Sequence, residues 1–275
     1  MKYRLVAMDM DGTLLNSQKE ITPYAKDVIK RASESGVVLA VCTGRLFASA
    51  DYYADLLGTD VPVIASNGAY IKDRRTDKVI FEKKLGDDRI RKITDIVKSY
   101  GFNVNYYTTS HVISENITPA TINYSKWNES MPEEKRIAVH IVKGLDNIME
   151  CYKDKIIKMV VNAKNLQELE ELRNIIKERF DVTVVSSWSN NIEIMAPEVS
   201  KGNAVKILAG LYGIDKSQVI CFGDNENDIS MIEYAKLGIA MGNATEALKA
   251  AADYITDTND NNGVAKAIEK FILEV

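Results

Sequence analysis

Two aspartates separated by a single residue, Asp9 and Asp11, end the first apolar run of this 275-residue chain. Side chains two residues apart on a strand share a face, so both carboxylates are expected at the carboxyl end of one strand, where open α/β sheets place their ligands. Carboxylates held this close repel each other, so either a cation lies between them or one takes up a proton. The pair therefore suits a metal site or a nucleophile beside a general acid, and a surface turn at Gly12 is the alternative explanation.

A second acidic segment near the C-terminus follows another apolar run, 219–222. Asp224 lies at the expected end of that strand, and Asp228 lies one helical turn further on if a helix starts there. Hard cations such as Mg²⁺ are bound by oxygen ligands, of which only a few are carboxylates in direct contact with the ion. Asp9, Asp11 and Asp224 would suit such a site. A solvated, acidic helix start favoured by the helix dipole would explain the same residues.

Two further segments could bind an anion. Thr43 and Gly44 follow the apolar run 37–42 and precede a predicted helix. The threonine hydroxyl and the free N–H groups at the start of that helix would attract negative charge. An ordinary threonine cap with a turn glycine is the alternative. Lys201 follows Ser200 at a predicted helix start, where the helix dipole disfavours a cation by less than about 1 kcal/mol. A nearby carboxylate or phosphate would offset that cost, and a solvated lysine is the alternative.

The elements that must position these residues alternate in type. The pattern of the first 70 residues predicts strand, helix, strand, helix and strand at 5–8, 22–35, 37–42, 46–57 and 61–65. This order implies a parallel sheet with crossover helices. The last 85 residues repeat the order, with predicted strands at 192–195, 219–222 and 238–241.

The middle of the chain has a different pattern. Its strands alternate apolar and polar residues, as at Ile137, Val139 and Ile141, which is typical of a sheet with one wet face. The stretch 117–135 gives no clear assignment. We therefore expect a doubly wound, Rossmann-like α/β core, with an α+β domain inserted after its third strand. The expected core is discontinuous, and the expected ranges are 1–83 and 188–275 for the core and 84–187 for the insertion.

The combined motifs resemble the haloacid dehalogenase (HAD) superfamily, and within it the Cof-like phosphatases with a type IIB cap. The resemblance extends over essentially the whole chain. The matching segments, in order, are DxDGTLL at 9–15, TGR at 43–45, SNGA at 66–69, the isolated Lys201, and GDxxNDxxM at 223–231.

The resemblance implies a role for each matching residue. Asp9 would be the nucleophile that becomes an aspartyl-phosphate, and Asp11 would protonate the leaving alcohol and then activate water. Mg²⁺ would be held by Asp9, the backbone carbonyl of Asp11 and Asp224, with support from Asp228. The phosphoryl group would be bound by the Met10 backbone, Thr43, Gly44, Lys201 and Asn227.

We therefore expect a Mg²⁺-dependent phosphatase that hydrolyses phosphomonoesters of small metabolites, with sugar phosphates as the first candidates. One alternative is a phosphomutase of the phosphomannomutase type, which would retain the phosphate. Another is a non-catalytic phosphometabolite sensor, which would need no nucleophile such as Asp9. The leaving group is not readable from the sequence, because it depends on which residues of the inserted domain face the substrate.

Composition narrows the class of partner. The net charge of −4 disfavours a broad nucleic-acid footprint, and no apolar run reaches the length of a membrane span. The three cysteines form no CxxC pair, which disfavours a disulfide framework or zinc site. His111 and His140 lack a metal-type partner at close spacing. We expect a cytoplasmic protein, either a monomer or a weak homo-oligomer, whose partner is a small phosphorylated metabolite.

Overall fold

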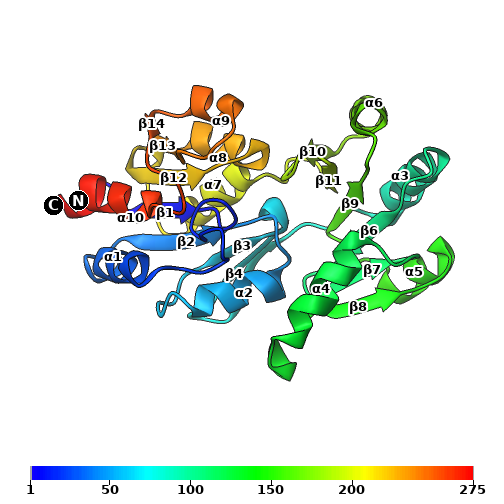
Figure 1. Cartoon of the computed structure of the whole chain (residues 1–275), viewed down its shortest axis with the longest axis horizontal. Coiled ribbons are helices and arrows are strands. Elements are labelled where there is room, and N and C mark those ends of the chain that lie inside the picture. The colour runs from blue at the N-terminus through cyan, green and yellow to red at the C-terminus, as the bar shows by residue number, and fades with distance from the viewer. Residues whose placement is uncertain (1, 275) are drawn as a thin grey trace. The chain divides into compact units, whose positions relative to one another are not determined.

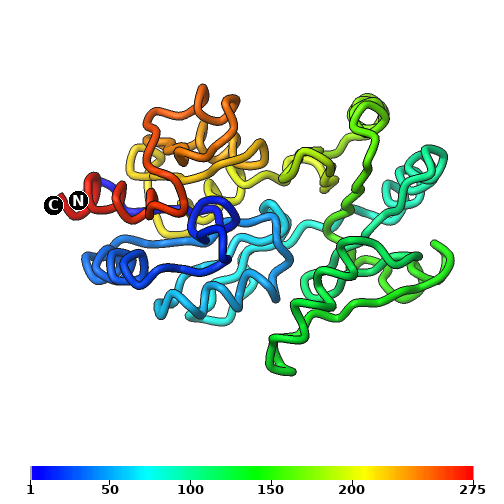
Figure 2. Tube along the Cα trace, viewed as in Figure 1, coloured from blue at the N-terminus to red at the C-terminus, as the bar shows by residue number. Residues whose placement is uncertain are grey.

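The computed structural model describes residues 2–274 and contains two compact units (Figure 1). The first unit comprises the chain up to Arg45, Ala50–Ile80 and the chain from Ser200 onward, and the second comprises Leu46–Ser49 and Phe81–Val199. The chain passes from the first unit to the second after residue 80 and belongs to the first again from residue 200. Figure 2 follows the chain trace from its blue N-terminal to its red C-terminal part. The expected fold class, an α/β core with a separate α+β insertion, is confirmed.

The larger sheet has eight strands within residues 2–274, in the spatial order β14-β13-β12-β1-β2-β3-β4-β5. Neighbouring strands are parallel from β14 to β3, and β4 runs antiparallel to β3. The strands are β1 Leu5–Met8, β2 Val38–Cys42, β3 Val63–Ala65, β4 Tyr70–Asp73, β5 Lys78–Glu82, β12 Val219–Gly223, β13 Leu237–Ala240 and β14 Tyr254–Ile255.

Helices cover both faces of this sheet (Figure 1). Their bounds are α1 Pro23–Glu34, α2 Phe47–Asp55, α7 Lys201–Leu211, α8 Ile229–Tyr234, α9 Glu246–Ala251 and α10 Gly263–Ile268. Helix α1 contacts α10, and α7 contacts α8. Every residue of β1 and β12 is buried, as expected for central parallel strands between two helical layers. The chain adds strands in one direction from β1 to β3 and in the opposite direction from β12 to β14. Because such crossovers are right-handed, the crossover helices of the two halves lie on opposite faces of the sheet.

The register of the central strands brings three chain segments to one edge of the sheet. Met8 of β1 lies beside Val41 of β2 and beside Phe222 of β12. The residues that follow these three positions therefore leave the sheet side by side. These residues include Asp9, Thr43 and Asp224, so strand pairing alone explains why distant parts of the sequence converge there.

The second unit is built on a mixed sheet in the order β10-β11-β9-β6-β7-β8. Its strands are β6 Val104–Tyr107, β7 His111–Ser114, β8 Ala138–Ile141, β9 Lys158–Asn162, β10 Thr183–Val185 and β11 Asn191–Met195. Strands β7 and β8 are parallel, and the other neighbours are antiparallel. Its helices are α3 Asp87–Ser99, α4 Pro119–Glu129, α5 Leu145–Tyr152 and α6 Leu166–Arg179.

Alternating side chains give the second sheet two different faces. Tyr106 and Ile113 belong to one apolar core, which α3, α5 and α6 complete. Their neighbours Tyr107 and Val112 belong to another cluster, against which Trp127 of α4 packs. The second unit therefore has a hydrophobic core of its own, formed between the sheet and three of its helices.

Three features differ from the sequence-based expectation. The strand expected at 192–195 in the parallel core is β11, which pairs antiparallel with β9 and β10 in the second sheet. All five of its residues are buried, so its pattern resembles that of a central parallel strand. The second unit accordingly runs to Val199, whereas the insertion was expected to end at 187.

The other two differences are strands and a helix that the sequence analysis did not predict. Strands β4 and β5 extend the larger sheet beyond its third expected strand. Helix α4 occupies much of the unassigned stretch 117–135, although it carries sequence signals for a helix start: Thr118 forms a capping box with Thr121, and Pro119 follows the cap. None of the helices in residues 2–274 has the length and hydropathy that a membrane span requires.

Candidate active site

Three carboxylates meet at the carboxyl ends of the central strands in the first unit. Asp9 follows β1, Asp224 follows β12, and Asp228 ends the short 3-10 turn Glu226–Asp228 that precedes α8. Each residue offers an oxygen, and these oxygens all lie within 4.8 Å of one another. Oxygen ligands in this number suit a hard divalent cation.

Lys201 is the cation that the structure places among these acids. Its side chain is completely buried, and its Nζ donates to Asp9 Oδ1 at 2.6 Å and to Asp228 Oδ1 at 2.5 Å. Ser200 caps the start of α7 by accepting a hydrogen bond from the Asn203 N–H. The unfavourable position of a lysine in the first turn of a helix is thus offset by two charge-assisted bonds.

The tight turn after Asp9 depends on glycine. Gly12 has a φ of +78°, and a Cβ built on it would lie 2.5 Å from Asp224 Oδ2. Only glycine meets both conditions without strain. The next residue, Thr13, donates from Oγ1 to Asp224 Oδ1 at 2.9 Å. The DxDGT turn therefore orients the Asp224 carboxylate as well as carrying Asp9.

Asp228 is held by the protein through both of its oxygens. Oδ1 accepts from Lys201, and Oδ2 accepts from the backbone N–H groups of Asp224 and Asn225, at 2.9 and 3.1 Å. A Cβ on Gly223 would lie 2.4 Å from the Asp228 Cβ, so the loop folds closely over this side chain. Asp228 thereby fixes the loop that presents Asp224.

Burial and neighbouring acids raise the proton affinity of Asp9 and of Asp224. Burial raises the pKa of Asp9 well above its ordinary value, with further contributions from Asp228 and Asp224 that oppose the effect of Lys201. Burial and Asp228 raise the pKa of Asp224 to about 7. Burial alone would lower the pKa of Lys201, but Asp228 and Asp9 raise it above its ordinary value.

A bound cation would relieve this repulsion. Three ionised carboxylates and one ammonium group carry a net charge of +1 − 3 = −2, which equals in magnitude the charge of one divalent cation. The donor set therefore fits a Mg²⁺-like ion in both chemistry and charge.

Asp11 lies outside this acidic cluster. Its carboxylate accepts two hydrogen bonds from Arg45, at 2.6 and 2.7 Å, and one from Lys19 at 2.9 Å. Burial raises the pKa of Asp11, but the bonds and charges of Arg45 and Lys19 outweigh it and hold that pKa well below its ordinary value. Sequence reasoning singled out neither cation. Arg45 stood in the quoted TGR motif, whereas Lys19 gave no signal.

The candidate phosphate-binding residues are linked by Asn67, which sequence reasoning did not assign a role. Thr43 is buried, its Oγ1 accepts from the Arg45 N–H, and its carbonyl accepts from the Asn67 N–H at 3.0 Å. Asn227 donates from Nδ2 to Asn67 Oδ1 at 3.0 Å. Asn67 therefore joins the end of β2 to the 223–228 loop, and the SNGA motif is the signal that could have identified it.

The two remaining phosphate-binding candidates lie in the same turns. Gly44 follows Thr43 at the end of β2. Met10 is fully buried, and its carbonyl accepts from the N–H groups of Thr13 and Leu15. The backbone around Asp9 is thus closed into a compact loop, whose position is set by β1.

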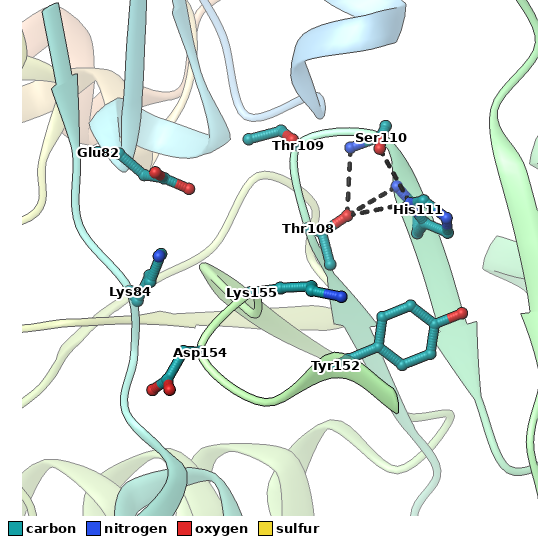
Figure 3. A pocket seen from close by; sticks show the side chains of 9 residues that line it. All are labelled: Glu82, Lys84, Thr108, Thr109, Ser110, His111, Tyr152, Asp154 and Lys155. Atoms are coloured by element: carbon teal, nitrogen blue, oxygen red, sulfur yellow. Dashed lines mark hydrogen bonds between the residues drawn. The ribbon is translucent and has the colours of Figure 1, made fainter. Parts of the chain in front are cut away.

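The second unit contains a cavity of about 210 Å³ (Figure 3). Thr108 Oγ1 accepts from the N–H groups of Ser110 and His111 at its edge. The His111 and His140 rings lie 5.1 Å apart, and His140 bonds the Tyr152 hydroxyl. These bonds hold the β6–β7 turn and its neighbours, so the two histidines have structural partners. The cavity is lined by Glu82, Lys84, Thr108, Thr109, Ser110, His111, Tyr152, Asp154 and Lys155.

Comparison with known proteins decides the family. A family model described as haloacid dehalogenase-like hydrolase matches residues 6–268. The chain belongs to the haloacid dehalogenase-like hydrolases. The putative phosphatase YxeH of Bacillus subtilis is 35% identical over 98% of this chain and 99% of its own length. The pyridoxal phosphate phosphatase YbhA of Escherichia coli is 27% identical over 99% of this chain and 100% of its own.

Solved structures of HAD proteins show the same fold. A haloacid dehalogenase-like hydrolase from B. subtilis matches with a TM-score of 0.87 and 26% identity, over 99% of this chain and all of that one. A sugar phosphatase described as HAD subclass IIB matches with a TM-score of 0.79 over 98% of both chains, and at 22% identity this likeness concerns the fold. The expected family and its phosphatase class are confirmed, and the fold of the chain matches that of a subclass IIB protein.

Proposed function

We propose that this HAD hydrolase is a Mg²⁺-dependent phosphatase that hydrolyses phosphomonoesters of small metabolites through an aspartyl-phosphate on Asp9. The observation that carries the proposal is the cluster of Asp9, Lys201, Asp224 and Asp228, of which all but Asp224 are buried. Phosphoryl transfer requires chiefly positioning and neutralisation of charge on the phosphoryl oxygens, and this cluster offers a nucleophile beside fixed cationic and metal-binding groups.

The reaction divides into two displacements at phosphorus. In the first, an Asp9 oxygen forms a bond to phosphorus, the bond to the ester oxygen breaks, and Asp11 gives that oxygen a proton. In the second, Asp11 takes a proton from water as the water oxygen bonds to phosphorus and Asp9 leaves. Two easier steps thereby replace one difficult displacement.

Other residues of the first unit would bind the phosphoryl group. Lys201 already lies 2.6 Å from Asp9 Oδ1, so its ammonium would also neutralise a phosphoryl oxygen at that carboxylate. Thr43, Gly44, the Met10 backbone and Asn227 would supply hydrogen bonds. Mg²⁺ would be held by Asp9, the Asp11 carbonyl and Asp224, with Asp228 in support, and when bound it would neutralise phosphoryl charge and fix orientation.

The names of two similar proteins support a substrate class for this chain. YbhA is by name a pyridoxal phosphate phosphatase, and the fold match of subclass IIB is by description a sugar phosphatase. Both names concern small phosphorylated metabolites. We infer the same class for this chain, with sugar phosphates as the first candidates.

A phosphate-release screen tests this function. The purified protein is assayed with and without Mg²⁺ on sugar phosphates, phosphoglycolate, pyridoxal phosphate and nucleotides. We expect Mg²⁺-dependent release from at least one small ester and its loss in Asp9→Asn. Turnover that persists in Asp9→Asn would contradict the mechanism, and an isomerised sugar phosphate without free phosphate would indicate a mutase instead.

A further inference from the structure

Arg45 holds the Asp11 carboxylate by both of its oxygens. Its Nε donates to Asp11 Oδ2 at 2.6 Å, and its Nη2 donates to Oδ1 at 2.7 Å. Two parallel bonds from a planar guanidinium fix the direction of a carboxylate as well as its distance. A lysine, which is a point charge on a flexible stem, cannot impose the same orientation.

The guanidinium is itself held in place. Its central carbon lies 4.6 Å from the centroid of the Tyr53 ring, a cation–π contact. The Arg45 side chain is 19% exposed and the Asp11 side chain 27% exposed, so the pair is largely shielded from water. Lys19 also reaches Asp11, but with a single bond from a side chain that is 45% exposed, and such contacts restrain weakly.

We propose that Arg45 is a positioning residue that aims Asp11 for proton transfer, an inference that rests on the proposed function. A general acid must come within about 3 Å of the atom it protonates, and a displacement of about 1 Å can reduce a rate by about 100-fold. When the O–H bond of Asp11 breaks and the proton moves to the leaving oxygen, the resulting carboxylate accepts both N–H groups of Arg45. The observed pairing is that of the carboxylate, which is both the product of this step and the form that takes a proton from water in the second displacement.

Leaving groups of different basicity test the role of Arg45. An alkyl phosphate needs a proton on its leaving oxygen, whereas p-nitrophenyl phosphate expels a stable anion that does not. The ratio kcat/KM reports the steps up to release of the leaving group. For Arg45→Met we expect kcat/KM to fall about 100-fold on the alkyl ester and less than about fivefold on the aryl ester. Arg45→Lys should lie between the wild type and Arg45→Met.

Two comparisons separate positioning from a general structural effect. Arg74→Met removes another arginine of the first unit that pairs with an aspartate, Asp51, at 2.7 Å, and it should leave the alkyl-to-aryl ratio unchanged. In an Asp11→Asn background, Arg45→Met should have little further effect on the alkyl ester, because residues that act through one another are not additive.

Different results would contradict the role of Arg45 and the proposed function. Equal losses on both esters, or a full further loss in the Asp11→Asn background, would overturn the role of Arg45 while leaving the phosphatase intact. Failure of the wild-type protein to hydrolyse either ester would overturn the proposed function and this role with it.

Discussion

The buried ammonium of Lys201 lies between the buried carboxylates of Asp9 and Asp228. Removal of the lysine would leave both buried carboxylates without an opposite charge to pair with. Lys201 and Asp228 have no exposed surface, and Asp9 has 6%. Burial of charge costs free energy unless it is paired and hydrogen-bonded, and truncation of one member of such a set typically costs about 3–5 kcal/mol. We therefore expect the lysine to contribute to stability, in addition to its proposed part in binding phosphate.

Lys201→Met should lower the free energy of unfolding by about 3 kcal/mol in the absence of Mg²⁺, because Asp9 and Asp228 lose their shared cation. Urea denaturation measures the change. Lys206→Met is the control, since Lys206 is an exposed lysine of the same helix, and its effect should stay within about 0.5 kcal/mol. Similar small effects in both variants would show that the buried pairs are not important for stability.

Protons should compete with the cation at the acidic cluster. The pKa of Asp224 is raised from 3.8 to about 7, so the folded protein binds more protons than the unfolded chain between these values. The contribution of Asp224 to stability is therefore present at low pH and falls as pH rises through that window. The proposed Mg²⁺ would bind the ionised form, so its stabilising effect should grow over the same range.

We thus expect the rise in Tm caused by Mg²⁺ to be small near about pH 5 and larger near about pH 8. Thermal unfolding with and without the ion measures it, and Asp224→Asn should lose most of the response. A Mg²⁺ effect that is equal at both pH values would contradict a site built on this carboxylate.

At the scale of elements, two glycines of α7 show how closely this helix packs against α8. A Cβ on Gly202 would lie 2.2 Å from the Ser230 carbonyl oxygen in α8, whereas a Cβ on Gly210 would meet nothing within 4 Å. Glycine at position 202 therefore lets α7 approach α8 closely, and this approach places Lys201 beside Asp228.

Alanine substitutions at the two positions should have opposite effects. Gly202→Ala should destabilise by more than about 1 kcal/mol, because its methyl group meets backbone. Gly210→Ala should stabilise by about 0.4–1 kcal/mol through the lower entropy of the unfolded chain. Chemical denaturation of both variants measures the difference. A stabilising Gly202→Ala would show that the approach of α7 to α8 is not tight.

The strands and strand ends that apolar runs mark directly in the sequence were predicted correctly. Periodicity and strand ends placed Asp9, Thr43 and Asp224 at one sheet edge, and the register of β1, β2 and β12 agrees. Strand β11 was placed in the wrong sheet, because it is short and buried along its whole length, and nothing in so short a segment tells which sheet it joins. The Arg45–Asp11 pair joins residues 34 positions apart, and no local pattern indicates such a contact.

At the scale of the whole molecule, the chain forms two compact units, and the second has a hydrophobic core of its own. The core of the second unit includes Leu172 of α6, which is fully buried. All three acids of the cluster, together with Lys201, lie in the first unit. Cation binding should therefore depend on the first unit alone.

Leu172→Ala should destabilise the second unit by about 2–5 kcal/mol, because it leaves a cavity in that core. Its Mg²⁺ affinity, measured by calorimetry at a temperature where both units are folded, should stay within about twofold of the wild type. Leu166→Ala is the control in the same helix, since Leu166 is 52% exposed, and it should change neither quantity. A tenfold loss of Mg²⁺ affinity in Leu172→Ala alone would contradict the independence of the site.

The central claim is that phosphate passes through a covalent bond to Asp9, and chemical trapping tests it most directly. The protein is mixed with Mg²⁺ and a substrate, quenched with acid and treated with borohydride, which reduces an acyl phosphate of aspartate to homoserine. Peptide mass spectrometry then identifies the converted residue. The proposed mechanism predicts homoserine at position 9 and none in Asp9→Asn. Substrate turnover with an unchanged Asp9, or with homoserine at another aspartate, would contradict it.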